Sequence, residues 1–262
     1  MNIDQWAFRF NCQGSSLVGI IDVPERPLSR GVLLLADAAQ YRVGAHRQFT
    51  LLSRALAVRG IPVMRFDRRG MGDSEGAAGS ADALDDDIRA ALREFFGHVP
   101  EMKEVVLLGL GDGASAAALY AGGDERVRGL VLLNPDVGVA DLESRAPRTA
   151  ALARLLEVGF WKKVAAGRHE RAAVPAAPRG AVVQGDAAPL SQRVAASLAA
   201  FRGKVLVVLG GAAPAGQEFA RLLACHRVDC RKVEIPGAGH HFASREWRDE
   251  VTGCSANWIT SW

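Results

Sequence analysis

Five runs of apolar residues follow one another along this chain, and segments with helical spacing separate most of them. The runs are GVLLLA (31–36), IPVMRFD (61–67), EVVLLG (104–109), VRGLVLLN (127–134) and KVLVVLG (204–210). Each is about one strand long and nearly continuous in apolar residues, as expected for a strand that is buried on both faces. Strands that alternate with helices form a parallel sheet with right-handed crossovers. The pattern therefore predicts an α/β fold with a mostly parallel, doubly wound sheet.

The elements between and around these runs divide the chain into a core and an insertion. Two strands, near 5–11 and 17–23, open the chain, and 229–235 is a late strand. Apolar spacing predicts helices over 46–59, 82–96, 114–121, 190–201, 217–225 and from Arg245 onward. The alternation fails between 136 and 202, a stretch that includes AAVPAAPRG. We therefore expect a core of residues 1–135 and 203–262 with an inserted cap at 136–202.

Composition excludes several classes of function. Of 262 residues, 49% are apolar, which is enough for the core of one domain. The 32 basic residues nearly balance the 29 acidic ones, and aromatic residues are few, so a nucleic-acid partner is not expected. The four cysteines, at positions 12, 225, 230 and 254, form no C-x-x-C pair, and no cluster has metal-ligand spacing. The sequence therefore predicts neither a metal nor a cofactor.

The apolar runs and the first residues bear on location. MNIDQWAFRF lacks both a basic segment and an apolar segment of the kind found in signal peptides. The longest apolar runs fall far short of the roughly 20 residues that span a bilayer. We therefore expect a cytoplasmic protein without a membrane span, and a homodimer is left open.

A glycine-rich turn, LLGLGDGAS (107–115), lies between a predicted strand and a helix. In the G-x-S-x-G elbow, small flanking residues permit the tight, strained turn that carries a nucleophile. Gly109 and Gly113 supply the flanks, but the centre is Gly111, which has no side chain and cannot form an acyl-enzyme. One alternative is a glycine-rich connection without a catalytic role. A nucleotide-binding loop is a weaker match, since Ala114 replaces the third glycine of G-x-G-x-x-G.

The loop after the last strand, PGAGHH (236–241), carries a candidate base. Enzymes with an elbow place their catalytic histidine there, and His240 is the first of two histidines to leave the strand end. A solvated surface histidine is the alternative. The orienting acid usually follows the strand at 204–210, but that loop has no acid before Glu218. Asp136, after the neighbouring strand, is the candidate replacement, and a helix-capping aspartate is the alternative.

The loop ADAAQYRVGAHRQF (36–49) follows the first buried strand, where such enzymes find one backbone N–H of the oxyanion hole. The other N–H belongs to the residue after the nucleophile, here Asp112. The candidate oxyanion or pocket residues are Asp112, Asp37, Ala38 and Tyr41. Asp37 is unexpected there, because a carboxylate would oppose the negative charge of a transition state.

Other nucleophiles near these motifs fit poorly. Ser74, in FDRRGMGDSEG, does not lie in an elbow pattern. Asp112 should point away from the elbow, and Ser115 lies about one helical turn further on, where we expect it to be buried.

Several motifs together resemble those of a known family. QYRVG with HRQF, FDRRGMGDSEG, GLGDGAS, FWKKVAAGR and GAGHHF followed by Trp247 resemble the α/β-hydrolases associated with the exosortase A system, which are similar to serine aminopeptidases and thioesterases. The resemblance runs from about residue 5 to 262 and implies an α/β-hydrolase fold. It places the family's nucleophile, a cysteine in a G-L-C-D-G turn, at Gly111 and the family's acid at Ala213. Only the family's histidine is matched, by His240.

The resemblance implies a degenerate triad and leaves three functions open. The first is a pseudo-hydrolase that binds an acyl- or ester-like small molecule. The second is a non-covalent acid/base enzyme of the lyase, isomerase or cyclase type, in which His240 acts with Asp136. The third is an ester or thioester hydrolase of the exosortase-associated type, with the nucleophile elsewhere or lost in this sequence.

Overall fold

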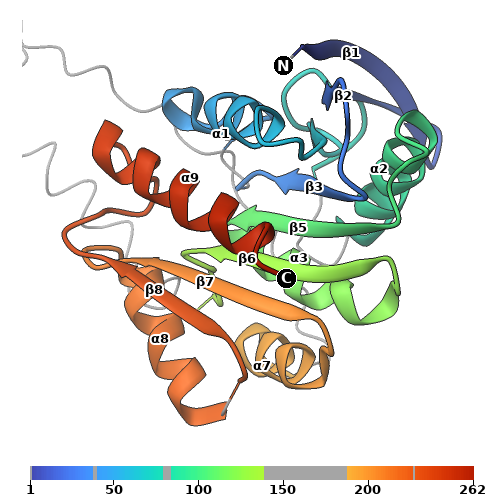
Figure 1. Ribbon diagram of the computed structural model, residues 1–262. Helices are drawn as coiled ribbons and strands as arrows, with labels where there is room; N and C mark the ends of the chain where they lie inside the picture. Colours follow the sequence, from blue (N-terminus) through green and yellow to red (C-terminus); the bar gives the residue numbers. More distant parts are fainter. Residues whose placement is uncertain (1, 38–39, 79–83, 139–187, 227) are drawn as a thin grey trace, which may run out of the picture. The chain divides into compact units, whose positions relative to one another are not determined.

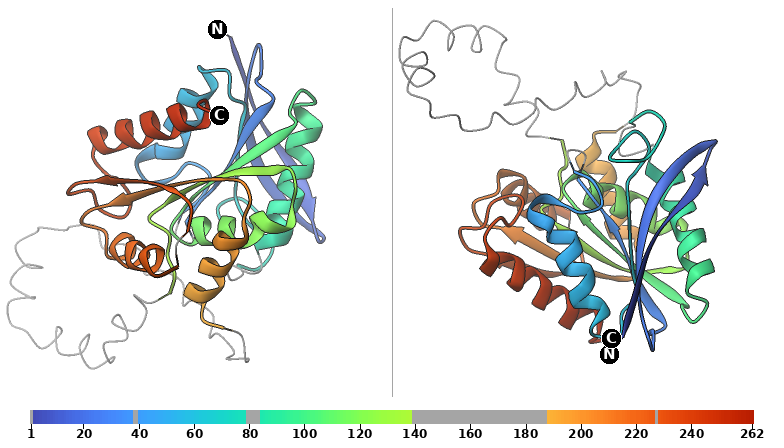
Figure 2. Two further views of the ribbon diagram at one scale, coloured as in Figure 1. Left: turned by 60° about the horizontal axis from the view of Figure 1, so that its bottom comes forward. Right: turned by 90° about the horizontal axis from the view of Figure 1, so that it is seen from above.

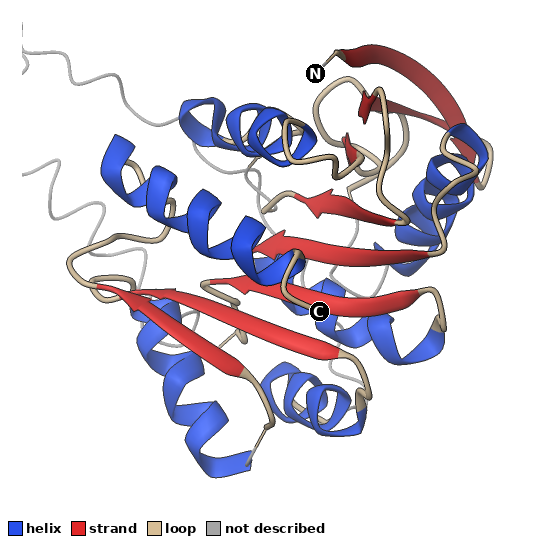
Figure 3. Cartoon of the chain, in the orientation of Figure 1, coloured by secondary structure: helices blue, strands red, loops and turns tan. Residues whose placement is uncertain are grey.

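The computed structural model describes residues 2–37, 40–78, 84–138, 188–226 and 228–262. Helices cover both faces of one sheet (Figures 1 and 3). The strands are β1 (Ile3–Cys12), β2 (Ser15–Pro24), β3 (Arg30–Leu35), β4 (Val63–Phe66), β5 (Glu104–Leu110), β6 (Val127–Leu133), β7 (Lys204–Gly210) and β8 (Arg231–Ile235). The helices are α1 (Gln48–Ala57), α2 (Leu84–His98), α3 (Asp112–Tyr120), α7 (Leu190–Ala200), α8 (Pro214–His226) and α9 (Arg245–Ile259), with 3-10 turns η1 (Ala45–Arg47) and η3 (Ala121–Gly123). Within the described ranges, no helix combines the length and the apolar character needed to cross a membrane.

The sheet is parallel except at one side. Its strand order is β1-β2-β4-β3-β5-β6-β7-β8. β2 pairs antiparallel with both β1 and β4, and all the remaining pairs are parallel. β1 and β2 form a hairpin whose turn residues, Gln13 and Gly14, have φ of 49° and 82°, as a tight two-residue turn requires. The predicted mostly parallel sheet is confirmed.

Alternate residues of the buried strands pack into two apolar clusters, one on each face. In β3, Leu33 and Leu35 join the cluster under α2, α3, α7 and α8, whereas Val32 and Leu34 join the cluster under α1 and α9. Figure 2 shows these two helical layers on opposite sides of the twisted sheet. Each fully buried side chain of this kind contributes roughly 1.5–3 kcal/mol to stability. The continuous apolar runs therefore exist because both faces of the sheet are covered.

The parallel arrangement positions the candidate site. Parallel neighbours end at the same edge of a sheet, and ligands bind beyond the carboxyl ends of such strands. The residues just beyond the ends of β3, β5, β6, β7 and β8 include Asp37, Gly111, Asn134, Ala213 and His240.

Three helices begin elsewhere than the sequence predicted: α8 begins at Pro214 rather than Gln217, and α1 and α3 also differ. α1 begins at Gln48 rather than His46, because His46 and Arg47 have φ of 52° and 60° and cannot continue a right-handed helix. α3 begins at Asp112 rather than Ala114, so Gly111 is its N-cap. The carboxyl group of Asp112 therefore lies at the N-terminus of a helix.

Contacts divide the chain into a unit of residues 1–137 and 188–262 and a second unit of residues 138–187. Most of the predicted cap, 139–187, lies outside the described residues, so a cap there stays a prediction. α7 was assigned to the cap from the sequence, but it belongs to the first unit and packs against α3 and α8. Its buried residues Val194, Ala195 and Leu198 form one helical stripe. This helix is therefore part of the core layer.

Candidate functional site

Gly111 lies at a sharp turn between β5 and α3. Its φ and ψ are 59° and −123°, a conformation that residues with side chains adopt only under strain. The flanking glycines are required by close packing. A Cβ on Gly109 would lie 2.5 Å from the carbonyl of Gly113, and a Cβ on Gly113 would lie 2.5 Å from the carbonyl oxygen of Leu35. The strand–turn–helix geometry of an elbow is therefore present, with no side chain at its centre.

The carboxylate of Asp37 fills the space into which a side chain at position 111 would extend. A Cβ on Gly111 would lie 2.9 Å from Cγ of Asp37 and 3.0 Å from each carboxylate oxygen. Carbon atoms in contact normally remain about 3.5–4.0 Å apart. Asp37 is only 8% exposed, and it follows β3, the strand beside β5. An acid that the sequence assigned to the oxyanion loop thus occupies the space beside Gly111.

His240 lies beside Asp37, on the loop between β8 and α9. Its Nε2 is 3.2 Å from Oδ2 of Asp37, and the two side chains are 28% and 11% exposed. Asn134 fixes this loop, because its Nδ2 donates to the carbonyl oxygen of His240 at 2.9 Å while its Oδ1 accepts from the N–H of Gly210 at 2.7 Å. The candidate base therefore has a carboxylate partner, and its backbone is tied to β6.

The loop that was expected to supply the orienting acid runs along the histidine loop. Ala213 is fully buried there. The N–H of Ala212 donates to the carbonyl oxygen of Ala238, two residues before His240, at 3.0 Å. Neither alanine offers a carboxylate, so this loop contributes backbone contacts only.

Asp136 contacts the turn at Gly111 through its backbone atoms. Its N–H donates to the carbonyl oxygen of Gly111 at 3.1 Å, and its carbonyl oxygen accepts from Oγ of Ser115 at 2.5 Å. The pairing of Asp136 with His240 stays a prediction, whereas the pairing of Asp37 with His240 is present in the structure.

Asp112 adds a second carboxyl group and a counter-charge. Nη1 and Nη2 of Arg68 donate to Oδ2 of Asp112 at 3.1 and 3.0 Å. Burial raises the pKa of Asp112 to about 6; the charge of Arg68 opposes this rise, and the charge of Asp37 and a hydrogen bond with it add to it. Neighbouring carboxyl groups resist joint ionisation, so this pair retains a proton to a pH near 6. A helix N-terminus that could stabilise an oxyanion therefore already faces carboxyl groups.

His241 places a second imidazole beside His240. Its ring lies edge-on to that of His240, with 4.7 Å between centroids. Its Nδ1 is 2.9 Å from Nε2 of Gln40, whose Oε1 accepts from the N–H of Ala45 at 2.9 Å. The amide nitrogen of Gln40 therefore donates to Nδ1 and leaves the imidazole proton on Nε2. Burial, followed by the charge of His240, lowers the pKa of His241.

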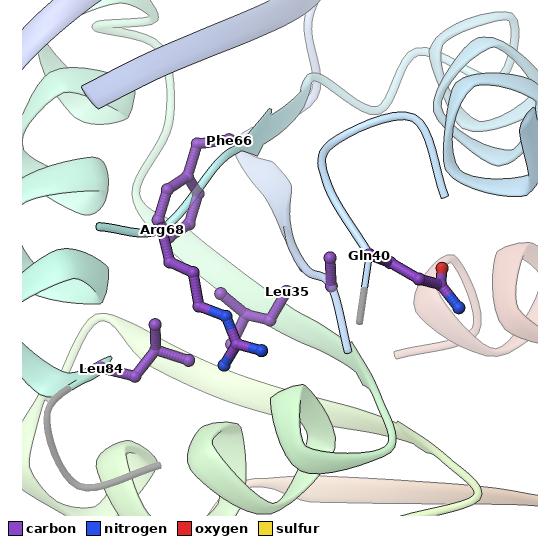
Figure 4. Close-up of a pocket in the computed structure, with 6 residues that line it drawn as sticks. Leu35, Gln40, Phe66, Arg68 and Leu84 are labelled. Atoms are coloured by element: carbon purple, nitrogen blue, oxygen red, sulfur yellow. The ribbon is translucent and has the colours of Figure 1, made fainter. Parts of the chain in front are cut away.

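A small hollow opens next to Arg68 (Figure 4). Its lining residues are Leu35, Ala36, Gln40, Phe66, Arg68 and Leu84. Of the predicted pocket residues, Ala38 lies outside the described residues, and Tyr41 is 47% exposed and is not among the lining residues. The hollow has room for about one water molecule, and its polar side chains have other partners: Arg68 is bonded to Asp112, and the amide of Gln40 is bonded to His241 and Ala45.

Among the described residues, one group of side chains has the geometry of metal ligands. The ligand atoms of Asp37, His240 and His241 all lie within 4.8 Å of one another. This group could not be predicted from sequence spacing, because Asp37 and His240 lie 203 positions apart.

The serines considered as alternative nucleophiles have structural partners. Oγ of Ser74 donates to the carbonyl oxygen of Asp67 at 2.6 Å and accepts from the N–H of Val18 at 2.9 Å. Ser115 is fully buried, as expected. Both hydroxyl groups hold loops in place.

Sequence reasoning missed Asn134, Gln40 and Arg68 as parts of the site. Asn134 is the last residue of the apolar run at 127–134, and the acid two residues later attracted attention instead. Gln40 and Arg68 lie in QYRVG and FDRRG, motifs in which the sequence analysis considered only Tyr41 and the nearby Ser74 as candidate site residues.

Known proteins resemble this chain in sequence profile and in fold. The profile of the alpha/beta hydrolase family matches residues 35–252. No curated protein matches the chain by sequence. An esterase from Pyrococcus furiosus has a TM-score of 0.72 at 14% identity, over 99% of this chain and 93% of that one. A serine hydrolase without a lid from Xanthomonas campestris has a TM-score of 0.64 at 18% identity, over 99% and 97% of the two chains. A serine hydrolase homologue from Coxiella burnetii has a TM-score of 0.60 at 18% identity, over 95% and 96%.

Proposed function

This chain belongs to the alpha/beta hydrolase family, and we propose that it is a member with a degenerate triad, which binds an acyl- or ester-like ligand without forming an acyl-enzyme. The observation that carries the proposal is the position of the Asp37 carboxylate, 2.9–3.0 Å from where a Cβ of residue 111 would lie. A carboxylate in this place supports the proposal, because it leaves little room for a nucleophilic side chain at position 111.

Three features of the site act in the same direction. Gly111 offers no nucleophile, Ala213 offers no acid, and the oxyanion side of the elbow faces the carboxyl groups of Asp112 and Asp37. Loss of triad members removes roughly a millionfold in rate, and the remainder of such a site gives only about 10³–10⁴-fold over water. An efficient covalent hydrolase is therefore disfavoured.

The class of ligand rests on the fold, because the hollow beside Arg68 has room for about one water molecule and its polar groups are bonded to other residues. The solved structures that share this fold include an esterase, which agrees with a ligand of the ester class.

A second candidate function is favoured by the 3.2 Å contact between Nε2 of His240 and Asp37. An imidazole held by a carboxylate can act as a general base, which typically contributes 10²–10⁴-fold to a rate. The chain would then be a non-covalent enzyme of the lyase, isomerase or cyclase type. In this candidate function, Asp37 is the carboxylate partner of His240, the role for which the sequence analysis considered Asp136.

The narrower resemblance to exosortase-associated hydrolases is part of the proposal. It rests on QYRVG, FDRRGMGDSEG and GAGHHF. Ester or thioester hydrolysis of that type is the third candidate. A cytoplasmic location and a homodimer also stay predictions; sedimentation of the purified chain tests the second of these.

Hydrolysis of p-nitrophenyl acetate and of a short-chain acyl thioester tests the proposal. We compare the wild type with His240→Ala, with Gly111→Ser, and with the double variant Gly111→Ser/Asp37→Ala, which adds a hydroxyl group and clears its space. Gly122→Ser is the matched control, since a Cβ on Gly122 meets nothing within 4 Å.

The wild type should show no burst of nitrophenol, and only the double variant should show one, of about one equivalent. Steady turnover by the wild type that is lost in His240→Ala, without a burst, would favour the non-covalent enzyme. A burst of one equivalent from the wild type would refute the loss of the covalent step.

A further inference from the structure

The only group of possible metal ligands among the described residues lies beside the turn at Gly111. Asp37 comes from the end of β3, and His240 and His241 come from the loop before α9. We propose that Asp37, His240 and His241 bind a divalent transition-metal ion such as Zn²⁺. This inference goes beyond the proposed function and is tested with the metal alone.

The donor set suits such an ion. Two imidazole nitrogens and one carboxylate oxygen form a common set for zinc and related metals, with a further position left open. Bonds of about 2.0–2.1 Å in a tetrahedral site place donor atoms about 3.3–3.4 Å apart. Nε2 of His240 and Oδ2 of Asp37 are already 3.2 Å apart. One ring nitrogen of His241 lies within 4.8 Å of both, so a closure of at most about 1.5 Å completes the set.

The backbone around these donors is fixed. Asn134 holds the carbonyl oxygen of His240 at 2.9 Å. The residue after His241 is Phe242, which is 2% exposed and packs into the cluster under α1 and α9. The side chain of His240 is 28% exposed, so an ion can reach the donors from solvent. Closure of the site would therefore come from rotation of side chains rather than from movement of the histidine loop.

One contact competes with the metal. Gln40 donates to Nδ1 of His241, so the imidazole proton sits on Nε2. Coordination through Nε2 would move that proton to Nδ1 and break the contact with Gln40. Loss of one such hydrogen bond costs about tenfold in affinity, which is less than what an added imidazole ligand provides. A glutamate at position 40 would accept from Nδ1–H, as carboxylates behind metal-bound histidines do.

The charge of the surroundings favours a cation. Asp37 has a second carboxyl group beside it, that of Asp112. The guanidinium of Arg68, a cation in this region, is bonded to Asp112 at 3.0 and 3.1 Å, so Asp112 partly offsets its charge. A metal here would act as a Lewis acid beside the turn from which the nucleophile is missing.

Titration of the chelator-treated full chain with Co²⁺, followed by its visible absorption, tests the site. We compare the wild type with His241→Ala, Asp37→Ala and Gln40→Glu. His226→Ala is the matched control, because His226 is an exposed histidine at the end of α8. Circular dichroism confirms that each variant is folded, and a competition with Zn²⁺ gives its affinity.

We expect one equivalent of Co²⁺ per chain with bands of tetrahedral intensity. His241→Ala and Asp37→Ala should each weaken binding at least a hundredfold, His226→Ala should not change it, and Gln40→Glu should tighten it about tenfold. Absence of stoichiometric binding, or binding that is unchanged in both His241→Ala and Asp37→Ala, would overturn the proposal. Because no ester is present, failure here is distinct from failure of the proposed function.

Discussion

Replacing Gly111 by alanine should destabilise the fold, and prior removal of the Asp37 side chain should cancel part of that loss. The added Cβ would lie 2.9–3.0 Å from three atoms of the Asp37 carboxylate. The 3.2 Å contact with His240 helps to hold Asp37 in this position. Alanine would also have to adopt φ 59° and ψ −123°.

The two penalties can be separated in magnitude. A side chain in this region of backbone space costs about 1–3 kcal/mol. Overlap with a packed neighbour costs a further 1–3 kcal/mol or so. Gly111→Ala should therefore lower the free energy of unfolding by about 2–6 kcal/mol, which is a fall in Tm of at least about 4 °C for a chain of this size. When Gly111→Ala is introduced into the Asp37→Ala variant, only the backbone penalty of about 1–3 kcal/mol should remain.

Urea unfolding of the wild type, both single variants and the double variant measures this coupling. Gly122→Ala is the control, because its Cβ would meet nothing within 4 Å and its effect should stay within about 0.5 kcal/mol. We expect a coupling of about 1–3 kcal/mol between positions 111 and 37. Effects that add to within about 0.5 kcal/mol would refute the claim that Asp37 fills the nucleophile's space.

Three further results are expected. Asn134→Ala should destabilise the chain by about 2–4 kcal/mol, because two buried hydrogen bonds are lost, and thermal unfolding measures it. Hydrogen bonds from Arg126 are the main reason that the pKa of Asp124 is lowered to about 2. Asp124→Asn should therefore cause its full loss of stability above the unfolded pKa near 3.8 and a smaller loss as the pH falls toward 2. A loss of stability that grows with acidity would contradict this. Burial raises the pKa of Cys12 to about 11, so a thiol reagent should modify the exposed Cys225 first, and equal rates would show that Cys12 is accessible.

The fold could be predicted from the sequence because its signals are local. Runs such as 31–36 and 204–210 are apolar throughout only when both faces of a sheet are covered, and the structure confirms those strands. α7 was misassigned because its buried stripe of Val194, Ala195 and Leu198 does not reveal which surface it covers. Its neighbours α3 and α8 are brought to it by the order of the strands.

The site was only partly predictable because its contacts are not local. Gly109 and Gly113 indicate the turn in the sequence, since a Cβ at either position would clash with backbone atoms. The partner of His240 could not be found in this way, because Asp37 lies 203 residues earlier. The sequence did indicate that Asp37 is special, because a carboxylate does not suit an oxyanion hole. That mismatch was the one sign in the sequence that Asp37 has a different role.

The mass of the intact wild-type chain, acid-quenched during reaction with p-nitrophenyl acetate, tests the central claim most directly. We expect the unmodified mass at every time point, with no acetyl group on the peptide that contains residues 109–115, because the elbow has no side chain and its space is filled. Stoichiometric acetylation that disappears in His240→Ala would show that a nucleophile still works in this site and would contradict the account.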